Sequence, residues 1–232
     1  MIHWMHPGEP FPPVTAALAE PNGLLAAGDD LSVARLIDAY RHGIFPWFNP
    51  GQPVLWWSPD PRMVLFPREL KVTRSLRKTL RNRSYEVRAD TSFRAVMQGC
   101  AEPRQEQDGT WISDEMVAAY CALHERGIAH SIETWIGGEL AGGLYGVALG
   151  RMFYGESMFT RVADASKIAL VHLVRQLARR QFGMIDCQMH TAHLASLGAR
   201  EIARAGFMRN LRELVNYPDV PGRWTLDRDL AE

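Results

Sequence analysis

The chain has 232 residues, of which 47% are hydrophobic and 22% charged, and its formal net charge is zero. These values are typical of a globular protein with one or two domains, and the charge balance gives no overall signal for nucleic-acid binding. No apolar run approaches the roughly 20 residues that span a bilayer, so we expect no membrane segment. The three cysteines show no spacing pattern and the N-terminus lacks signal-peptide features, which together predict a cytoplasmic protein in a reducing compartment.

The N-terminal part of the chain predicts one helix followed by an irregular segment. The helix is predicted for residues 31–42, with Gly43 as its stop. Residues 43–62 then hold several prolines and three of the seven tryptophans. Because proline fixes φ and removes a backbone donor, we expect this segment to be neither a regular helix nor a central strand. Its tryptophans form either a stacking platform for an aromatic ligand or the small core of a Pro-rich loop.

From residue 63 onward the pattern changes to alternating strands and helices. Strands are predicted for residues 63–66, 85–88 and 184–189, helices for 73–81, 92–100, 113–127, 164–182 and 192–197, and a β-meander for 130–136, 140–149 and 151–154. This order predicts an α+β fold, with a small N-terminal α+β domain at residues 1–62 and a mixed-sheet domain at 63–232. The second domain resembles the GNAT (acyl-CoA N-acyltransferase-like) fold.

A basic strip occupies residues 68–88, where lysines and arginines outnumber the two glutamates Glu69 and Glu86. Such a strip is the electrostatic footprint that a nucleic-acid backbone requires, although it is also typical of a solvated helix face. The cations that we assign to a phosphate backbone under the first interpretation are Arg74, Arg77, Lys78, Arg81 and Arg83.

Polar residues lie at the end of the last predicted strand. Alternate side chains of a strand share a face, so Asp186 and Gln188 are expected to point the same way and Cys187 the opposite way. A carboxylate and a carboxamide side by side can orient an attacking group through hydrogen bonds, or they can simply cap the next helix. Glu156 follows the meander among apolar neighbours, where it either binds a cationic group or pairs with a structural arginine.

Several other kinds of site are excluded or disfavoured. The sequence GESMF lacks the second glycine of the G-x-S-x-G nucleophile elbow. Cys187, His190 and His193 have the spacing C-x2-H-x2-H but no evident fourth ligand, so we expect no metal. No nucleotide phosphate loop occurs. The Gly-rich loop that GNAT enzymes use for the pyrophosphate of acetyl-CoA is also missing, so we expect no cofactor and an acyl donor other than coenzyme A.

A series of long motifs carries a specific resemblance over about residues 10–211. The chain resembles the leucyl/phenylalanyl-tRNA–protein transferases of bacteria, with Asp29 standing where that family usually has a second glycine. The motifs, in chain order, are PNGLLAAGDDLS, GIFPWF, LWWSPDPR, the pair Trp111-Ile112, AHSIE, GGLYG, GESMF, ASK-x-AL, IDCQ and HLASLGA.

This resemblance implies an enzyme that transfers Leu, Phe and, less readily, Met from aminoacyl-tRNA to the α-amino group of an N-terminal Arg or Lys. The product is a degradation signal read by the bacterial N-degron machinery. Because the donor ester is already activated, no ATP, metal or coenzyme A is implied. We expect the enzyme to act as a monomer.

The resemblance also implies roles for individual residues. Asp186 and Gln188 match the catalytic pair, and Glu156 matches an acid that holds the amine or the basic side chain of the acceptor. Trp47 and Trp111 match aromatics at the adenosine end of the donor. Trp56 and Trp57 are expected to seal the junction between the domains. The implied aminoacyl pocket, part of which has the spacing of any core-facing helix, consists of Leu144, Phe153, Met158, Leu170, Leu173, Leu177 and Ile185.

Two other functions stay open at this point. One is a GNAT-like N-acetyltransferase that uses acetyl-CoA, against which the missing pyrophosphate loop counts. The other is a non-catalytic module that binds tRNA or an N-degron, with the aromatic residues and the basic strip as its ligand surface.

Overall fold

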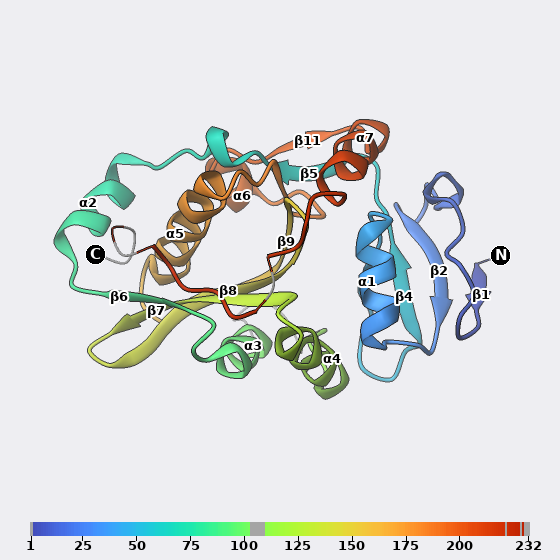
Figure 1. Cartoon of the computed structure of the whole chain (residues 1–232), viewed down its shortest axis with the longest axis horizontal. Coiled ribbons are helices and arrows are strands. Elements are labelled where there is room, and N and C mark those ends of the chain that lie inside the picture. The colour runs from blue at the N-terminus through green and yellow to red at the C-terminus, as the bar shows by residue number, and fades with distance from the viewer. Residues whose placement is uncertain (1, 103–109, 221, 228, 230–232) are drawn as a thin grey trace.

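The computed structural model describes residues 2–102, 110–220, 222–227 and 229. Its strands form two sheets, and the smaller one is built from the N-terminal residues (Figure 1). The helix α1 (Val33–Arg41) lies on the side of this sheet that faces the rest of the chain. The small sheet has the order β1-β2-β4-β3, with strands β1 (His3–Met5), β2 (Leu24–Gly28), β3 (Phe45–Pro46) and β4 (Val54–Trp57).

The N-terminal helix is confirmed, but one prediction for the segment that follows it is wrong. The hydroxyl oxygen of Ser32 accepts a hydrogen bond from the Arg35 backbone N–H and begins α1. The tryptophan- and proline-rich segment does hold a central strand, because β4 pairs with both β2 and β3. The prolines permit this arrangement because none lies within β4, and Pro46 belongs to β3 at the sheet edge.

The second sheet is mixed, and its order is β11-β5-β10-β9-β8-β7-β6. The predicted meander is confirmed as β7, β8 and β9, and β10 then pairs with β9 in parallel. Gly137 and Gly138 both take positive φ at the turn between β7 and β8. The strands are β5 (Arg62–Leu65), β6 (Glu86–Ala89), β7 (Ala129–Ile136), β8 (Glu139–Leu149), β9 (Met152–Thr160), β10 (Met184–Asp186) and β11 (Arg200–Ile202).

Helices cover both faces of this sheet. The long helix α5 packs on one face, and α3 and α4 pack on the other (Figure 1). The α+β fold with a mixed sheet is therefore confirmed. The helices are α2 (Arg74–Asn82), α3 (Phe93–Ala101), α4 (Asp114–Glu125), α5 (Ala165–Arg179), α6 (Ala192–Ser196) and α7 (Arg204–Leu214). Single 3-10 turns lie at Val14–Ala16 and Pro67–Glu69.

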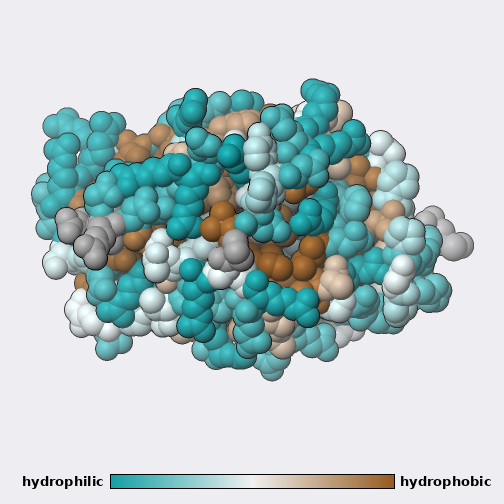
Figure 2. All heavy atoms as spheres, in the orientation of Figure 1, coloured by the Kyte–Doolittle hydropathy of each residue, from teal (hydrophilic) through white to brown (hydrophobic). Residues whose placement is uncertain are grey.

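The hydrophobic core has two parts. One runs from the small sheet through α1 to the α3–α4 face of the second sheet, and the other lies between that sheet and α5. Hydrophobic residues also reach the surface near the middle of the face in Figure 2, where hydrophilic residues surround them. The first part of the core joins residues on both sides of position 62, so a domain boundary there stays a prediction.

Two strands differ from their predicted extents in ways that matter for the site. β9 continues through Gly155 to Thr160, so Glu156 lies within the sheet and does not follow the meander. β10 ends at Asp186, and Gln188 lies beyond it with a positive φ of 56°. The first difference arises because the sequence pattern places the end of the strand before Gly155. In the structure, Gly155 instead lies at a pairing irregularity inside β9.

Candidate functional site

A cavity of about 600 Å³ opens beside the second sheet. Its wall combines residues of the small sheet with the strands β8, β9 and β10 and the helix α5. Such a volume falls within the range of small-molecule sites, which are mostly apolar with a few polar groups. The lining residues are Phe45, Pro46, Trp47, Leu65, Cys100, Glu102, Thr110, Trp111, Leu144, Tyr145, Phe153, Gly155, Glu156, Ser157, Met158, Leu170, Leu173, Ile185, Cys187, Gln188, Met189, Thr191, His193 and Leu194.

Most of the residues that the sequence assigns to a substrate site meet in this cavity. Two are not among its lining residues. Leu177 lies one turn beyond Leu173 on α5 and is fully buried in the core, and Asp186 is fully buried behind Gln188. The predicted residues that do line it are Trp47, Trp111, Leu144, Phe153, Glu156, Met158, Leu170, Leu173, Ile185 and Gln188.

Glu156 reaches the cavity because of a β-bulge. The pairing of β8 with β9 shifts from Tyr145 opposite Ser157 to Gly146 opposite Gly155, which leaves Glu156 as the extra residue. Bulges of this kind redirect a side chain and are common beside active sites. The bulge thus presents a carboxylate on a strand whose other cavity residues are uncharged, with the apolar Phe153 and Met158 on either side of it.

The carboxylate of Glu156 is held by two donors. Its Oε2 accepts a hydrogen bond of 3.0 Å from the Tyr120 hydroxyl, and its Oε1 accepts one of 3.4 Å from Gln188 Nε2. The Tyr120 hydroxyl is in turn hydrogen-bonded to that of Tyr40. Burial raises the pKa of Glu156 from 4.5 to about 7, against a smaller lowering by the two tyrosine hydroxyls. A group with this pKa can accept and release a proton near neutral pH.

Asp186 forms a buried ion pair with Arg62. The guanidinium donates from Nε to Oδ1 at 2.8 Å and from Nη2 to Oδ2 at 2.6 Å, and neither side chain is exposed. Oδ1 also accepts from the backbone N–H of Gln188 at 3.0 Å. Asp186 therefore fixes the left-handed turn that aims Gln188 at Glu156. This differs from the expected arrangement, in which both side chains share one face of a strand.

The three tryptophans of residues 43–62 divide into one exposed ring and two buried ones. Trp47 is 38% exposed at the cavity, whereas Trp56 is 1% exposed and packs edge-on against Phe11. Trp57 donates from its ring N–H to the Trp47 carbonyl at 2.7 Å, and the two rings lie 5.5 Å apart. Trp57 thus supports Trp47, which is a more specific role than the expected seal between domains.

Some residues of the site carry no signal in the sequence. Tyr145 lines the cavity, and its buried hydroxyl has no hydrogen-bond partner in the described part of the chain. Tyr120 lies on the apolar stripe of α4, and this position predicts only that its ring packs in the core. Arg62 is the last residue of the motif LWWSPDPR, but its ion pair with Asp186 is evident only in the folded structure. Long-range contacts of this kind are invisible to local patterns.

The basic helix α2 is a separate surface. Its cations line a depression of about 770 Å³, and none of them forms an ion pair with a described carboxylate. Arg83 instead donates to the Ala163 carbonyl, so it ties the end of α2 to the loop before α5. The lining cations are Arg74, Arg77, Lys78 and Arg81.

The described residues contain neither a cluster of metal-ligating side chains nor a membrane-spanning helix. No three His, Cys, Asp or Glu side chains within this part of the chain gather in a way that could hold a metal ion. None of its helices combines the length and apolar character needed to cross a membrane.

Two solved structures that match part of this chain are distant from it in sequence. One is L-PGS from Bacillus licheniformis, with a TM-score of 0.38, 8% identity, and coverage of 73% of this chain and 56% of that one. Another is a GCN5-related N-acetyltransferase from Kribbella flavida, with a TM-score of 0.34, 11% identity, and coverage of 71% and 58%.

Sequence relatives are close and span the whole chain. Proteins named leucyl/phenylalanyl-tRNA–protein transferase include one from Nitrosospira multiformis, 64% identical over 100% of both chains. The one from Chromobacterium violaceum is 65% identical over 97% of this chain and 96% of its own. The sequence model of leucyl/phenylalanyl-tRNA protein transferase matches residues 64–212, and that of its N-terminal domain matches 29–60. The chain belongs to the leucyl/phenylalanyl-tRNA protein transferase family.

Proposed function

We propose that the 600 Å³ cavity binds the aminoacyl end of leucyl- or phenylalanyl-tRNA, and that the acceptor amine attacks the ester beside Glu156 and Gln188. Family membership makes the chain an aminoacyltransferase that takes its acyl group from tRNA and passes it to a protein. The observation that carries the proposal is the convergence, in one cavity, of apolar walls with a single hydrogen-bonded pair of a carboxylate and a carboxamide.

The donor side chain would occupy the apolar part of the cavity. Walls of Leu, Met, Phe and Ile match Leu, Phe and Met side chains in chemistry. An apolar pocket discriminates between similar side chains by only about 1–3 kcal/mol per methylene, so several such donors can be used. Such a pocket would reject β-branched Val and Ile by shape. Trp47 and Trp111, near the opening, would stack on the terminal adenosine of the donor.

The chemical step is aminolysis of an ester. The nitrogen lone pair of the acceptor amine forms a bond to the ester carbonyl carbon, and the bond from that carbon to the ribose oxygen breaks. The amine loses one proton and the leaving oxygen gains one. Glu156, with a pKa of about 7, can carry that proton between them. Gln188 orients the amine, and the Asp186–Arg62 pair holds Gln188, so much of the rate comes from positioning.

The acceptor in this proposal is a protein with N-terminal Arg or Lys. A cationic acceptor suits a site whose two lining carboxylates are Glu156 and Glu102. Glu102 is paired with Arg161, whereas Glu156 has no ion-pair partner among the described residues. Glu156 is therefore the carboxylate that we assign to the acceptor. We further propose that the enzyme acts in the cytoplasm as a monomer, with a domain boundary near residue 62.

The tRNA body would lie along α2. Cations without carboxylate partners are available to phosphates, and α2 packs against α5, which lines the cavity. Binding through phosphates is independent of sequence and sensitive to salt. The residues assigned to this contact are Arg74, Arg77, Lys78 and Arg81, with Arg83 in a supporting position.

The test is a transfer assay with radiolabelled leucyl-tRNA and a peptide that begins with Arg. Label should move to the peptide without added ATP, metal or coenzyme A. A peptide that begins with Ala is the matched control and should gain little label. Transfer that depends on acetyl-CoA in place of leucyl-tRNA would favour an acetyltransferase, and binding of tRNA without any labelled peptide would favour a non-catalytic module.

A further inference from the structure

The chain after α7 returns across the second sheet and buries a tryptophan there. We call residues 222–227 the C-terminal strap (Figure 1). Trp224 is 3% exposed although it lies in irregular chain. The Thr225 carbonyl accepts from Arg180 at 3.1 Å, and the Asp227 backbone N–H donates to the Gln176 side chain at 2.9 Å. The strap is thus hydrogen-bonded to the C-terminal end of α5, the helix that lines the cavity.

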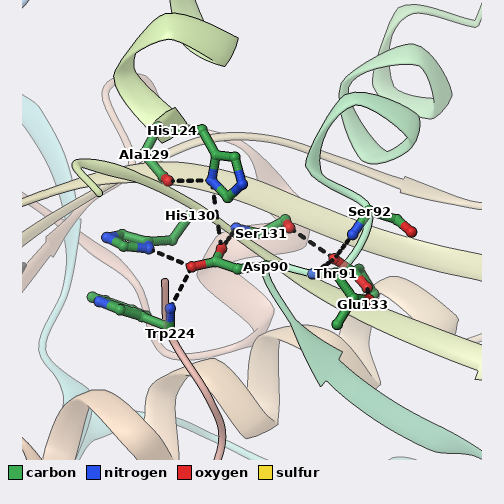
Figure 3. Close-up of polar contacts among 9 residues, drawn as sticks. All are labelled: Asp90, Thr91, Ser92, His124, Ala129, His130, Ser131, Glu133 and Trp224. Carbon is green, nitrogen blue, oxygen red and sulfur yellow. Dashed lines mark hydrogen bonds and ion pairs between the residues drawn. The ribbon is translucent and has the colours of Figure 1, made fainter. Parts of the chain in front are cut away.

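Asp90 anchors the strap to the sheet (Figure 3). Its Oδ2 accepts from the Trp224 backbone N–H at 2.6 Å and from His130 Nδ1 at 2.8 Å, while its Oδ1 accepts from the Ser131 N–H at 2.8 Å. The Trp224 ring stacks on the His130 ring, with centroids 3.9 Å apart and planes 15° apart. Backbone and ring are therefore both fixed, and Trp224 occupies one defined position.

This position lies directly behind the cavity wall. The ring of Trp224 is 6.0 Å from that of Phe153, centroid to centroid, and Phe153 lines the cavity. The Phe153 ring covers Gly146, where an added Cβ would lie 2.6 Å from it. Gly146 pairs with His130 across the sheet, so the Phe153 ring and the Trp224–His130 stack share one face. Trp224 also belongs to the same core cluster as the cavity residue Leu173.

We propose that Trp224 is a positioning residue for donor selection: it supports Phe153 from behind and so sets the depth of the aminoacyl pocket. This inference rests on the proposed donor pocket. Protein interiors are close-packed, so removal of the Trp224 ring gives the Phe153 ring room to withdraw. A deeper pocket favours a larger donor side chain. The strap begins after residue 212, where the match to the family's transferase model ends.

The experiment compares two donors on one tRNA body, charged with either Leu or Phe. Full-length wild type, Trp224→Leu and Trp224→Phe are assayed for kcat/KM with each donor. The Phe-to-Leu ratio should rise roughly tenfold in Trp224→Leu, the lower end of what one methylene changes in an apolar pocket, and less in Trp224→Phe. A general loss of stability would lower kcat/KM by the same factor for both donors and would leave their ratio unchanged. An unchanged ratio in both variants would overturn the inference.

Two further variants separate the possible failures. Arg179→Ala removes ion pairs to Asp227 and Asp229 without touching Trp224, and it should leave the ratio unchanged. Phe153→Leu should raise the ratio, and its effect should not add to that of Trp224→Leu because the two rings act together. If Phe153→Leu leaves the ratio unchanged, the donor pocket itself is wrong. If Phe153→Leu raises it and the Trp224 variants do not, only the role of the strap is wrong.

Discussion

Replacing Glu156 with glutamine should change how the stability of the protein depends on pH. Burial raises the pKa of Glu156 in the folded state from 4.5 to about 7. Between these values the folded state binds a proton that the unfolded state does not, so the free energy of unfolding falls as pH rises through this window. At 1.36 kcal/mol per pKa unit, the full effect is about 3 kcal/mol, of which about 2 kcal/mol falls between pH 5.5 and 8.5.

Glutamine removes the titration but keeps most of the shape. It loses one favourable contact, because its amide group cannot accept from both Tyr120 and Gln188. That loss costs about 1 kcal/mol and does not depend on pH. The assay is urea unfolding of wild type and Glu156→Gln at pH 5.5 and 8.5. The stability of the variant relative to wild type should improve by about 2 kcal/mol at the higher pH.

A difference in stability that is the same at both pH values would contradict this prediction. It would mean that Glu156 titrates normally and is not the proton carrier near neutral pH. The transfer rate provides a second readout. In wild type it should rise with pH through about 7 as Glu156 becomes ionised, and in Glu156→Gln only the rise that comes from deprotonation of the acceptor α-amino group, with a pKa of about 8, should remain.

Three other predictions concern separate parts of the molecule. Asp186→Leu leaves the buried charge of Arg62 unpaired and should lower the free energy of unfolding by roughly 3–5 kcal/mol, whereas adding Arg62→Met should restore most of that stability but not the transfer activity. Trp47→Ala should raise the KM for the donor roughly tenfold with little change in kcat, because stacking is worth about 1–3 kcal/mol per base. The salt dependence of tRNA binding should flatten by about 0.7–0.9 per lost phosphate contact when Ala replaces Arg77, Lys78 and Arg81.

Each of these has an outcome that contradicts it. If Arg62→Met does not restore stability to Asp186→Leu, the pair does more than balance its own charges. An unchanged KM for Trp47→Ala would leave that exposed ring without a role in donor binding. An unchanged salt slope would make α2 an ordinary solvated face, as the sequence allows.

Regular elements could be predicted from the sequence because their signals are local. The apolar stripe of α5 and the glycine pair between β7 and β8 each lie within a few residues of what they determine. So does Ser113, whose hydroxyl accepts from the Met116 backbone N–H and begins α4. The motifs likewise led to ten of the residues that line the cavity. Leu177 shows the limit of periodicity, since it shares the spacing of Leu170 and Leu173 but is buried in the core and does not line the cavity.

The remaining features depend on contacts between distant residues. The β-bulge at Glu156 arises from register against β8, and no pattern within β9 signals it. Arg62 and Asp186 are 124 positions apart, and Trp224 is 134 positions from Asp90. A lone tryptophan in irregular chain has no periodicity that would mark it as core. These residues hold the site, and only the folded structure brings them together.

We propose that acyl transfer takes place at the Glu156–Gln188 pair within the cavity. The most direct test is single-turnover transfer from radiolabelled leucyl-tRNA to an Arg-initiated peptide by wild type and Gln188→Ala, with the donor Kd measured on the same samples. In Gln188→Ala the transfer rate constant should fall roughly 100-fold, the size of the effect of one positioned polar group, with nearly unchanged donor affinity. Equal rate constants for the two proteins would contradict it.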